Sequence, residues 1–241
     1  MKFDKSWTGN WENAFRGLRH PLESYAKSDS NFGICSIFEY SKELILTYKD
    51  NPYAEYVKLG PNDLDLAQRM IKAGSPNDKF LRQIFVSVDI TAPLYWWKEM
   101  DTYKVATVAN STSTMHKLAS TPITADCFEM DDYTGDLEVY NNEPYQECFI
   151  TDDIWEEIIN HCETLRLRYL ETKDKRYWKE LIRLLPESWL QTRTWTANYA
   201  TLRNIIHWRE GHRLTEWASF IDWCHTLPYA DELLFYEQKS N

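Results

Sequence analysis

Residues 198–212 read NYATLRNIIHWREGH, and apolar residues recur along them at a helical spacing. This spacing predicts one amphipathic helix over the whole stretch. At the helical repeat, Asn198 and Arg209 lie about 20° apart in projection, and His212 lies about 40° to the other side of Asn198. Polar groups within an apolar stripe need partners, because burying them unpaired costs about 1–3 kcal/mol each. We therefore expect the helix to line a cavity, with Asn198 and Arg209 directed toward protein groups or a polar ligand.

Two earlier segments also carry clear signals. Residues 62–74 predict a helix that Asn62 or Asp63 caps and that Gly74 ends. Apolar residues alternate with others over 84–91, which predicts a strand with one buried face.

The remaining apolar stripes predict mostly helices. They cover the following ranges: 94–103, 152–165, 177–185 and 213–225. Asp152 or Asp153 is the expected cap of the second of these, and Pro186 ends the third. Residues 34–38 and 43–48 fit either a strand or the start of a helix. Together the signals predict one α+β domain over residues 1–241, a helix-rich body with a small sheet.

One acidic segment interrupts this pattern. Residues 126–153 are rich in acids and broken by Gly135 and Pro144. Loops of this length often carry function or move. We expect a surface excursion over 123–151.

Composition excludes several classes of protein. The chain has 27 Lys and Arg against 37 Asp and Glu, a net charge of −10, which disfavours binding to nucleic acid. Its five cysteines include no C-x-x-C pair, which is typical of reduced cytosolic thiols. No run reaches the roughly 18 apolar residues that span a bilayer, so we expect a cytoplasmic protein without a membrane segment. Glycine is scarce, and neither G-x-G-x-x-G nor a Walker motif is present.

Motifs for metal or nucleophilic catalysis are weak. The histidines and cysteines show no H-E-x-x-H pattern, so we predict no metal site. The hydroxyls of 111–114, followed by His116 and Lys117, suit a bound anion or simply a polar loop. Most C-terminal arginines are expected to pair with acids, and Arg209 is the exception because its predicted helix sector is apolar.

In their order along the chain, these segments resemble the flavin-dependent thymidylate synthase family. The match begins at residues 66–74, continues through 88–97 and the Ser/Thr-rich segment, and is clearest from Leu185-Pro186 to about Trp217. The resemblance implies a homotetramer with a small, mostly antiparallel sheet, FAD held across subunits and dUMP beside it. It implies reductive methylation of dUMP or a related pyrimidine nucleotide. Methylenetetrahydrofolate would supply the carbon, reduced FAD the hydride, and NADPH would be a further co-substrate.

The resemblance also implies roles for particular residues. The FAD side would comprise Asn198, Asn204, His212, Tyr103, Lys104, Thr107 and Asn110. The nucleotide side would comprise Ser113, Arg183, Arg209 and His116, with Arg209 and Ser113 as the catalytic candidates. Arg209 would stabilise negative charge that develops on the uracil ring.

The signature segment departs from the family pattern. The family has Arg-His-Arg where this chain has Thr102-Tyr103-Lys104, and a later arginine is replaced by Met115. Each lost arginine removes charge-assisted hydrogen bonds of about 1.5–3 kcal/mol. Two alternatives therefore stay open. One is a non-catalytic nucleotide-binding or assembly protein that keeps the fold, and the other is a flavoenzyme with another substrate, whose pocket residues 126–153 reshape.

Overall fold

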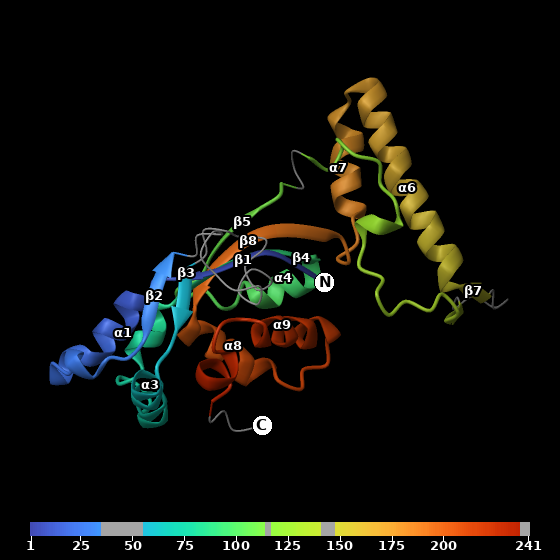
Figure 1. Ribbon diagram of the computed structural model, residues 1–241. Coiled ribbons are helices and arrows are strands. Elements are labelled where there is room, and N and C mark those ends of the chain that lie inside the picture. Colours follow the sequence, from blue (N-terminus) through green and yellow to red (C-terminus); the bar gives the residue numbers. More distant parts are fainter. Residues whose placement is uncertain (35–54, 114–116, 141–147, 237–241) are drawn as a thin grey trace, which may run out of the picture. The chain divides into compact units, whose positions relative to one another are not determined.

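The computed structural model describes residues 1–34, 55–113, 117–140 and 148–236 (Figure 1). The undecided ranges 34–38 and 43–48 lie almost wholly outside these residues. In chain order the elements are β1 (Lys2–Gly9), α1 (Trp11–Arg19), η1 (His20–Leu22), η2 (Tyr25–Lys27), β2 (Asn31–Ile34), β3 (Glu55–Lys58), α3 (Pro61–Ala73), η3 (Lys79–Gln83), β4 (Phe85–Pro93), α4 (Leu94–Met100), β5 (Val108–Ser111), η4 (Ala125–Cys127), β6 (Glu138–Tyr140), β7 (Cys148–Ile150), α6 (Thr151–Thr172), α7 (Lys175–Leu184), β8 (Leu190–Asn198), α8 (Tyr199–Arg209), α9 (Thr215–His225) and η5 (Ala230–Leu234). The predicted class is confirmed: the fold is α+β, rich in helices, with a small sheet.

The chain forms two compact units. Unit 1 comprises Met1–Ile90, Asp101–Asn110 and Arg193–Asn241, and unit 2 comprises Thr91–Met100 and Ser111–Thr192. The single-domain assignment over 1–241 stays a prediction, because compactness alone does not show whether either unit folds independently.

The main sheet has the strand order β1-β4-β8-β5. The strand predicted at 84–91 is confirmed as β4, and its alternating residues Val86, Val88 and Ile90 are buried. The opposite face of this sheet is polar. There Ser87 Oγ lies 3.0 Å from Thr196 Oγ1 of β8, and Thr91 Oγ1 lies 2.7 Å from Thr192 Oγ1 in the same register. Period-two burial thus gives the sheet one apolar and one polar face.

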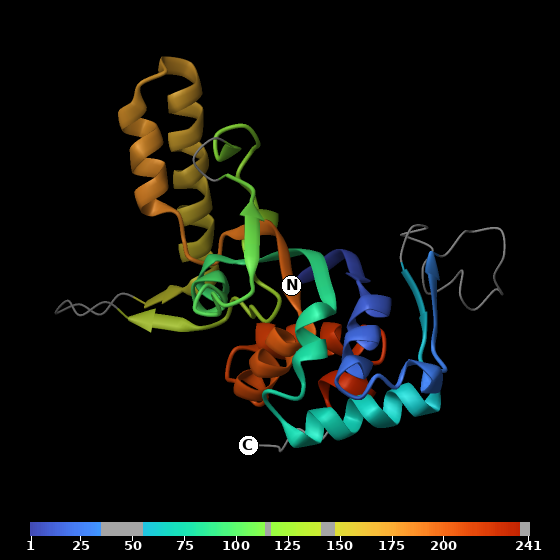
Figure 2. The same cartoon turned by 90° about the vertical axis from the view of Figure 1, so that its left-hand side faces the viewer.

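The helix predicted at 62–74 is confirmed as α3, but its predicted cap is wrong. Gly60 is the N-cap residue, and Pro61 occupies the first helical position, where its missing N–H costs no hydrogen bond. Gly74 ends the helix at a positive φ of 69°. Figure 2 shows the antiparallel β2–β3 hairpin standing at the N-terminal end of α3.

The single helix predicted over 198–212 is wrong at both ends. β8 runs through Asn198, and α8 covers only Tyr199–Arg209. Asn198 is the N-cap, and its Oδ1 accepts the Thr201 N–H at 2.9 Å. His212 lies past the helix, beyond Gly211 with its φ of 70°. The projected angles therefore do not apply to Asn198 or His212.

Aromatic packing fills unit 1. Trp11 of α1 meets Tyr199 of α8 edge-on, with ring centroids 5.2 Å apart, and both side chains are fully buried. Trp217 and Phe220 of α9 meet at 5.7 Å in the same manner. Edge-to-face contacts of this kind are favourable beyond the area they bury.

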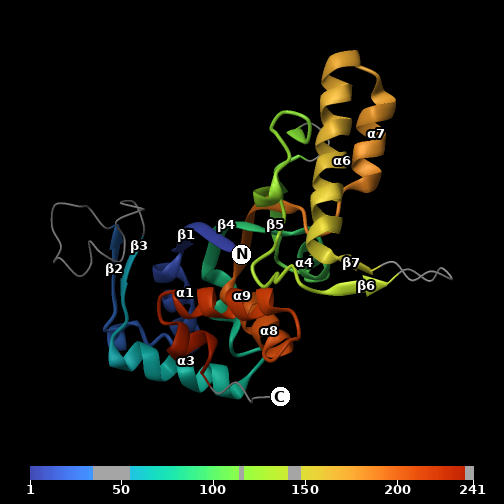
Figure 3. The ribbon, with the colours of Figure 1, turned by 90° about the vertical axis from the view of Figure 1, so that its right-hand side faces the viewer.

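Unit 2 is built on the helical hairpin of α6 and α7 (Figure 3). The stripes predicted at 152–165 and 177–185 are confirmed, since Cys162 and Leu181 are fully buried in one apolar cluster. The predicted cap of α6 is wrong: Ile150 precedes the helix, and Asp152 and Asp153 lie in its first turn, where acids complement the helix dipole. The described part of the predicted excursion at 123–151 contains η4 and the antiparallel β6–β7 hairpin.

Candidate functional site

The clearest polar cluster of unit 1 surrounds Arg209, the last residue of α8. Its Nε donates to the Tyr103 hydroxyl at 2.9 Å. Its Cζ lies 4.5 Å from the centroid of the Trp217 ring and 5.4 Å from that of Tyr103. We call Tyr103, Arg209, His212 and Trp217 the Arg209 cluster. A guanidinium held against two aromatic faces is fixed in orientation by cation–π attraction as well as by its hydrogen bond.

His212 completes the cluster from the turn after α8. Its backbone N–H donates to the Arg209 carbonyl at 3.1 Å, and its ring lies edge-on to Trp217 at 6.2 Å. Its Nδ1 accepts the Leu214 N–H at 3.1 Å. With Nδ1 as acceptor, the neutral ring carries its proton on Nε2.

The segment between α4 and β5 is held along α8. Asp101 pairs with Arg193 of β8 at 2.8 Å, and the Val105 carbonyl accepts the Thr201 hydroxyl at 3.4 Å. The Thr107 hydroxyl donates to the Tyr103 carbonyl at 2.5 Å. These bonds hold the backbone of the loop around Tyr103, and the loop in turn keeps the tyrosine side chain beside Arg209. Lys104 of the same segment is exposed, and so is Asn110 of β5.

The two asparagines expected at FAD occupy different surroundings. Asn198 is 5% exposed and caps α8, whereas Asn204 is exposed in the middle of that helix. Asn198 and Arg209 lie at opposite ends of α8, separated by about 16 Å at the helical rise. A ligand that touched both side chains would therefore have to be elongated, and the expectation that both are directed into one cavity stays a prediction.

The remaining candidates lie in unit 2 or outside the described residues. Arg183 of α7 is exposed and pairs with Glu180 at 2.8 Å. Ser113 is half-buried, and its carbonyl accepts the Lys117 N–H at 3.0 Å. His116 and Met115 lie outside the residues that the structure describes.

Arg203 shows a bonding mode that the sequence pattern did not suggest. Its Nη1 donates to the carbonyls of Leu233 and Leu234, both at 2.7 Å, and of Tyr236 at 3.1 Å. Burial lowers the pKa of Arg203 below its ordinary value, and the charge of Asp78 opposes that shift. Arg203 thus fastens the C-terminal segment to α8.

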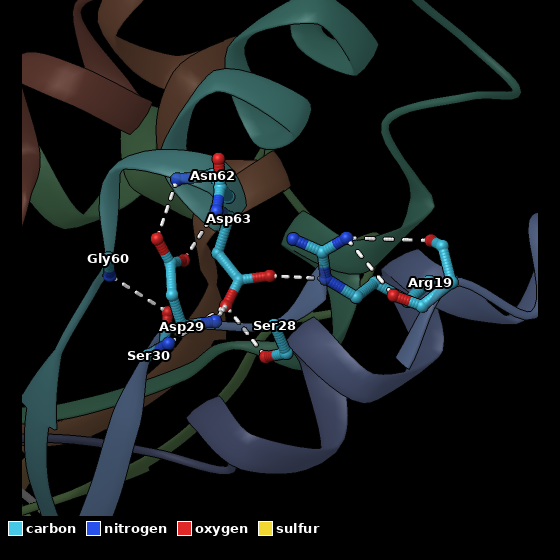
Figure 4. A network of polar contacts seen from close by, with 8 residues as sticks. Arg19, Ser28, Asp29, Ser30, Gly60, Asn62 and Asp63 are labelled. Atoms are coloured by element: carbon cyan, nitrogen blue, oxygen red, sulfur yellow. Dashed lines mark hydrogen bonds and ion pairs between the residues drawn. The ribbon is translucent and has the colours of Figure 1, made fainter. Parts of the chain in front are cut away.

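A buried ion pair, which sequence reasoning missed, joins α1 to α3 (Figure 4). Arg19 Nε donates to Asp63 Oδ1 at 2.5 Å, and the two side chains are 4% and 0% exposed. The other carboxylate oxygen accepts the Ser28 hydroxyl at 2.8 Å and the Ser30 N–H at 3.1 Å. Burial raises the pKa of Asp63, but the bonds from Ser30, Ser28 and Arg19 outweigh it, so the pKa lies below its ordinary value.

This Asp63 network is structural in character. Asp29 accepts the backbone N–H groups of Asn62 and Asp63 at 2.9 and 3.1 Å, which satisfies the free donors at the start of α3. From the sequence alone, an acid such as Asp63 in the first turn of a helix is explained equally well by compensation of the helix dipole. Its partner Arg19 is 44 positions away, so only folding identifies the pair.

The described residues contain neither a candidate metal site nor a candidate membrane-spanning helix. Residues 1–34, 55–113, 117–140 and 148–236 hold no group of three His, Cys, Asp or Glu side chains placed to bind a metal ion. None of the helices observed there combines the length and apolarity that crossing a membrane requires.

Comparison with solved structures gives the class of fold, which is that of the flavin-dependent thymidylate synthases. One such enzyme, ThyX from Helicobacter pylori complexed with FAD and dUMP, is 14% identical, with 99% of each chain covered and a TM-score of 0.61. A second structure of the H. pylori enzyme with FAD and dUMP gives 14% identity, coverages of 98% and 97% and a TM-score of 0.62.

A related methylase also matches. The UMP/dUMP methylase PolB from Streptomyces cacaoi, bound with 5-Br UMP, is 14% identical over 89% of this chain and 97% of its own, with a TM-score of 0.50. No protein-family model matches the sequence. No curated protein matches it either. The similarity is therefore one of fold, since it is found by comparing structures whose sequences are only 14% identical to this chain.

Proposed function

We propose that this chain is a divergent flavin-dependent nucleotide methylase that acts on dUMP or a related pyrimidine nucleotide. The observation that carries the proposal is a fold match over nearly the whole chain to an enzyme solved with FAD and dUMP. The Arg209 cluster supports it, because it presents a fixed guanidinium among aromatic faces. A forked cation beside flat rings suits a planar, anionic ligand such as a pyrimidine nucleotide.

In this proposal Arg209 binds the nucleotide and stabilises negative charge developing on its ring. Ser113, Arg183 and His116 are the further candidates on the nucleotide side. Since Arg183 and Ser113 belong to unit 2, their part in the site stays a prediction. Because of the likeness to thymidylate synthases, we propose a homotetramer in which neighbouring subunits complete each site. We also propose that the protein lies in the cytoplasm.

The polar side chains of unit 1 include the types of hydrogen-bond donor that a flavin cofactor needs. Lys104, Asn110 and Asn204 are exposed, and they offer one cation and two amides to phosphate and ring groups. Tyr103, Thr107, Asn198 and His212 are the further candidates on this side, where they would orient the cofactor and exclude water. Bound FAD, when reduced, would supply the hydride, while methylenetetrahydrofolate supplies the carbon and NADPH restores the reduced flavin.

A colour and turnover assay tests the proposal. Purified protein is expected to be yellow, or to become yellow with FAD and to melt at a higher temperature when FAD is added. Tritium release from 5-labelled dUMP in the presence of reduced FAD and methylenetetrahydrofolate is the expected activity. A colourless protein with no FAD-dependent change in melting temperature would contradict it.

A second candidate is a non-catalytic nucleotide-binding protein on the same fold. Thr102-Tyr103-Lys104 stands where the resembled family has Arg-His-Arg, and Tyr103 engages the guanidinium of Arg209 within this chain. This candidate predicts dUMP binding without flavin and without tritium release. Isothermal titration with dUMP, with and without FAD, separates the two functions.

A further inference from the structure

One large aromatic side chain of α8 is open to solvent. Trp208 is 63% exposed, whereas Leu202 and Ile205 of the same helix are fully buried. An aromatic ring contributes more binding energy than most side chains when a ligand covers it. A single exposed apolar residue is nevertheless common on protein surfaces, so the groups around Trp208 determine whether it belongs to a binding site.

Two polar side chains lie on the same side of α8 as this indole. At the helical repeat, Thr201 lies about 20° and Asn204 about 40° from Trp208 in projection. Asn204 is exposed and precedes Trp208 by about 6 Å along the helix axis. We call Thr201, Asn204 and Trp208 the open face of α8. It suits a flat heteroaromatic ring, because an indole can stack on the ring while an amide donates and accepts hydrogen bonds at its edge.

The two arginines of α8 are engaged away from this open face. Arg203 donates to the carbonyls of the C-terminal segment. Arg209 directly follows Trp208, so it projects about 100° away from it, and its Nε donates to the Tyr103 hydroxyl. The three residues of the open face carry no charge. This face therefore fits the ring of a ligand better than it fits a phosphate group, which needs cations.

The position of Trp208 next to Arg209 indicates which ring it would hold. In the proposed function Arg209 binds the pyrimidine nucleotide, and reduced flavin gives a hydride to that nucleotide. Hydride transfer requires the two reacting rings to be held next to each other. The ring beside the residue that follows Trp208 is therefore the redox-active isoalloxazine of FAD, and not its adenine.

We propose that Trp208 stacks on the isoalloxazine ring of FAD beside Asn204, so that this chain holds the cofactor mainly by its ring. The inference rests on the proposed function and adds to it a residue and a mode of binding. Thr102-Tyr103-Lys104 stands where the resembled family has Arg-His-Arg, so Lys104 is the one cation left in that motif. Stacking compensates for this loss, because an aromatic contact to a bound ring is worth about as much as one charge-assisted hydrogen bond.

Titration of the full-length chain with riboflavin tests the proposal, because riboflavin carries the isoalloxazine ring without phosphate or adenine. Trp208→Ala is expected to raise the dissociation constants of riboflavin and FAD by about tenfold, whereas Trp208→Phe keeps a stacking ring and should stay within about threefold of wild type. The control Tyr177→Ala removes an exposed ring of α7 and should bind both ligands as wild type does. Because Trp208 is exposed, its variants should melt at nearly the wild-type temperature without ligand.

Salt and ligand fragments separate the possible outcomes. Raising the salt from about 0.1 to 1 M shortens the Debye length from about 10 to 3 Å, and it should change the FAD dissociation constant of wild type by less than about threefold. The stacking role alone would be overturned if Trp208→Ala bound riboflavin as tightly as wild type, or if it lost affinity for AMP and not for riboflavin. A wild-type chain that bound FAD but not riboflavin would also overturn it. A wild-type chain that bound neither flavin would contradict the proposed function together with the stacking role.

Discussion

The orientation of the Arg209 side chain is determined by its neighbours. Tyr103 bonds its Nε, and Trp217 lies under its guanidinium. Trp217 is fully buried, so the aromatic support is part of the core of unit 1. A side chain held in this way loses less rotational freedom when a ligand binds. The same reasoning makes Tyr103 a positioning residue in the proposed nucleotide site.

Removing the Tyr103 hydroxyl should therefore weaken nucleotide binding while leaving the fold intact. Tyr103→Phe keeps the ring but loses the hydrogen bond that holds the Arg209 guanidinium in place. Ordering this side chain on binding would then cost about 0.5–1.5 kcal/mol, or roughly twofold to tenfold in the dissociation constant for dUMP. Isothermal titration measures the constant. The control Tyr177→Phe, at an exposed tyrosine of α7, should bind as wild type does. Unchanged affinity in Tyr103→Phe would remove its positioning role.

Asp63 should contribute strongly to stability, because Arg19 would be left buried without its counter-charge. Asp63→Asn is expected to lower the free energy of unfolding by about 3–5 kcal/mol in urea titrations. The matched control Asp65→Asn breaks the exposed pair with Arg69, and its effect should stay within about 0.5 kcal/mol. Similar losses in the two variants would contradict the buried role of Asp63.

The pH dependence of this contribution has a definite sign. The folded pKa of Asp63 lies below its ordinary value, so the unfolded chain binds the proton more readily. The contribution is complete above the unfolded pKa of about 4 and is lost as the pH falls through the folded pKa. Urea titrations at a series of acidic pH values should show wild type losing stability relative to Asp63→Asn.

At the scale of elements, α8 connects several parts of unit 1. It begins at the capping side chain of Asn198, fastens the C-terminal segment through Arg203 and ends at Arg209. Its position is thereby determined at the start, the middle and the end. The helix can present Arg209 reproducibly because these contacts fix its ends.

Comparing Asn198 with Asn204 separates capping from ligand contact. Asn198→Ala should lower the free energy of unfolding by about 1 kcal/mol through loss of the cap. Asn204→Ala lies on the exposed side of α8 and should change stability by less than about 0.5 kcal/mol. If Asn204 contacts FAD, its variant will show weaker FAD binding at unchanged stability. Urea titration of both variants measures the change in the free energy of unfolding, and FAD titration measures the change in affinity for FAD.

At the scale of the whole molecule, each unit has its own interior. Cys162 is fully buried in unit 2 and Cys224 is fully buried in unit 1. Burial raises the pKa of the Cys162 thiol to about 11 and that of Cys224 well above its ordinary value. Cys148 is exposed by contrast. The thiols therefore report separately on the packing of the two units.

Thiol labelling should follow this burial. In a Cys35→Ser background at about pH 8, a thiol-specific dye should label Cys148 first and half-buried Cys127 more slowly. Cys162 and Cys224 should react only when the chain opens, because the thiolate is scarce and access is blocked. Mass spectrometry of digested protein assigns each site, and a denatured sample is the control. Labelling of Cys162 as fast as Cys148 would contradict the described core of unit 2.

Local patterns predicted much of this molecule. The alternation of β4, the stripes of α6 and α7 and the glycine stop of α3 all appear where their spacing indicates. The α+β class follows from such signals, because burial at period two or 3.6 depends only on neighbours in sequence. The order of these segments also indicated a family resemblance, of which the comparison with solved structures supports the fold.

One local signal was overlooked. Along β8, the buried residues Gln191, Trp195 and Ala197 alternate with threonines, a pattern typical of a strand. Recognising it would have ended the predicted helix at Asn198 and made that asparagine a cap. The site roles assigned by resemblance stay predictions, because neither the geometry of the described residues nor the fold comparison tests them.

The periodic elements and the acidic balance can be read from the amino-acid sequence without coordinates. Which distant groups meet is known only from the folded chain: Arg19 meets Asp63, Arg203 meets the carbonyls near the C-terminus, and Tyr103 meets Arg209. The partners in these contacts are at least 30 positions apart in the chain. Their energies depend on burial and orientation, which no short window of sequence encodes.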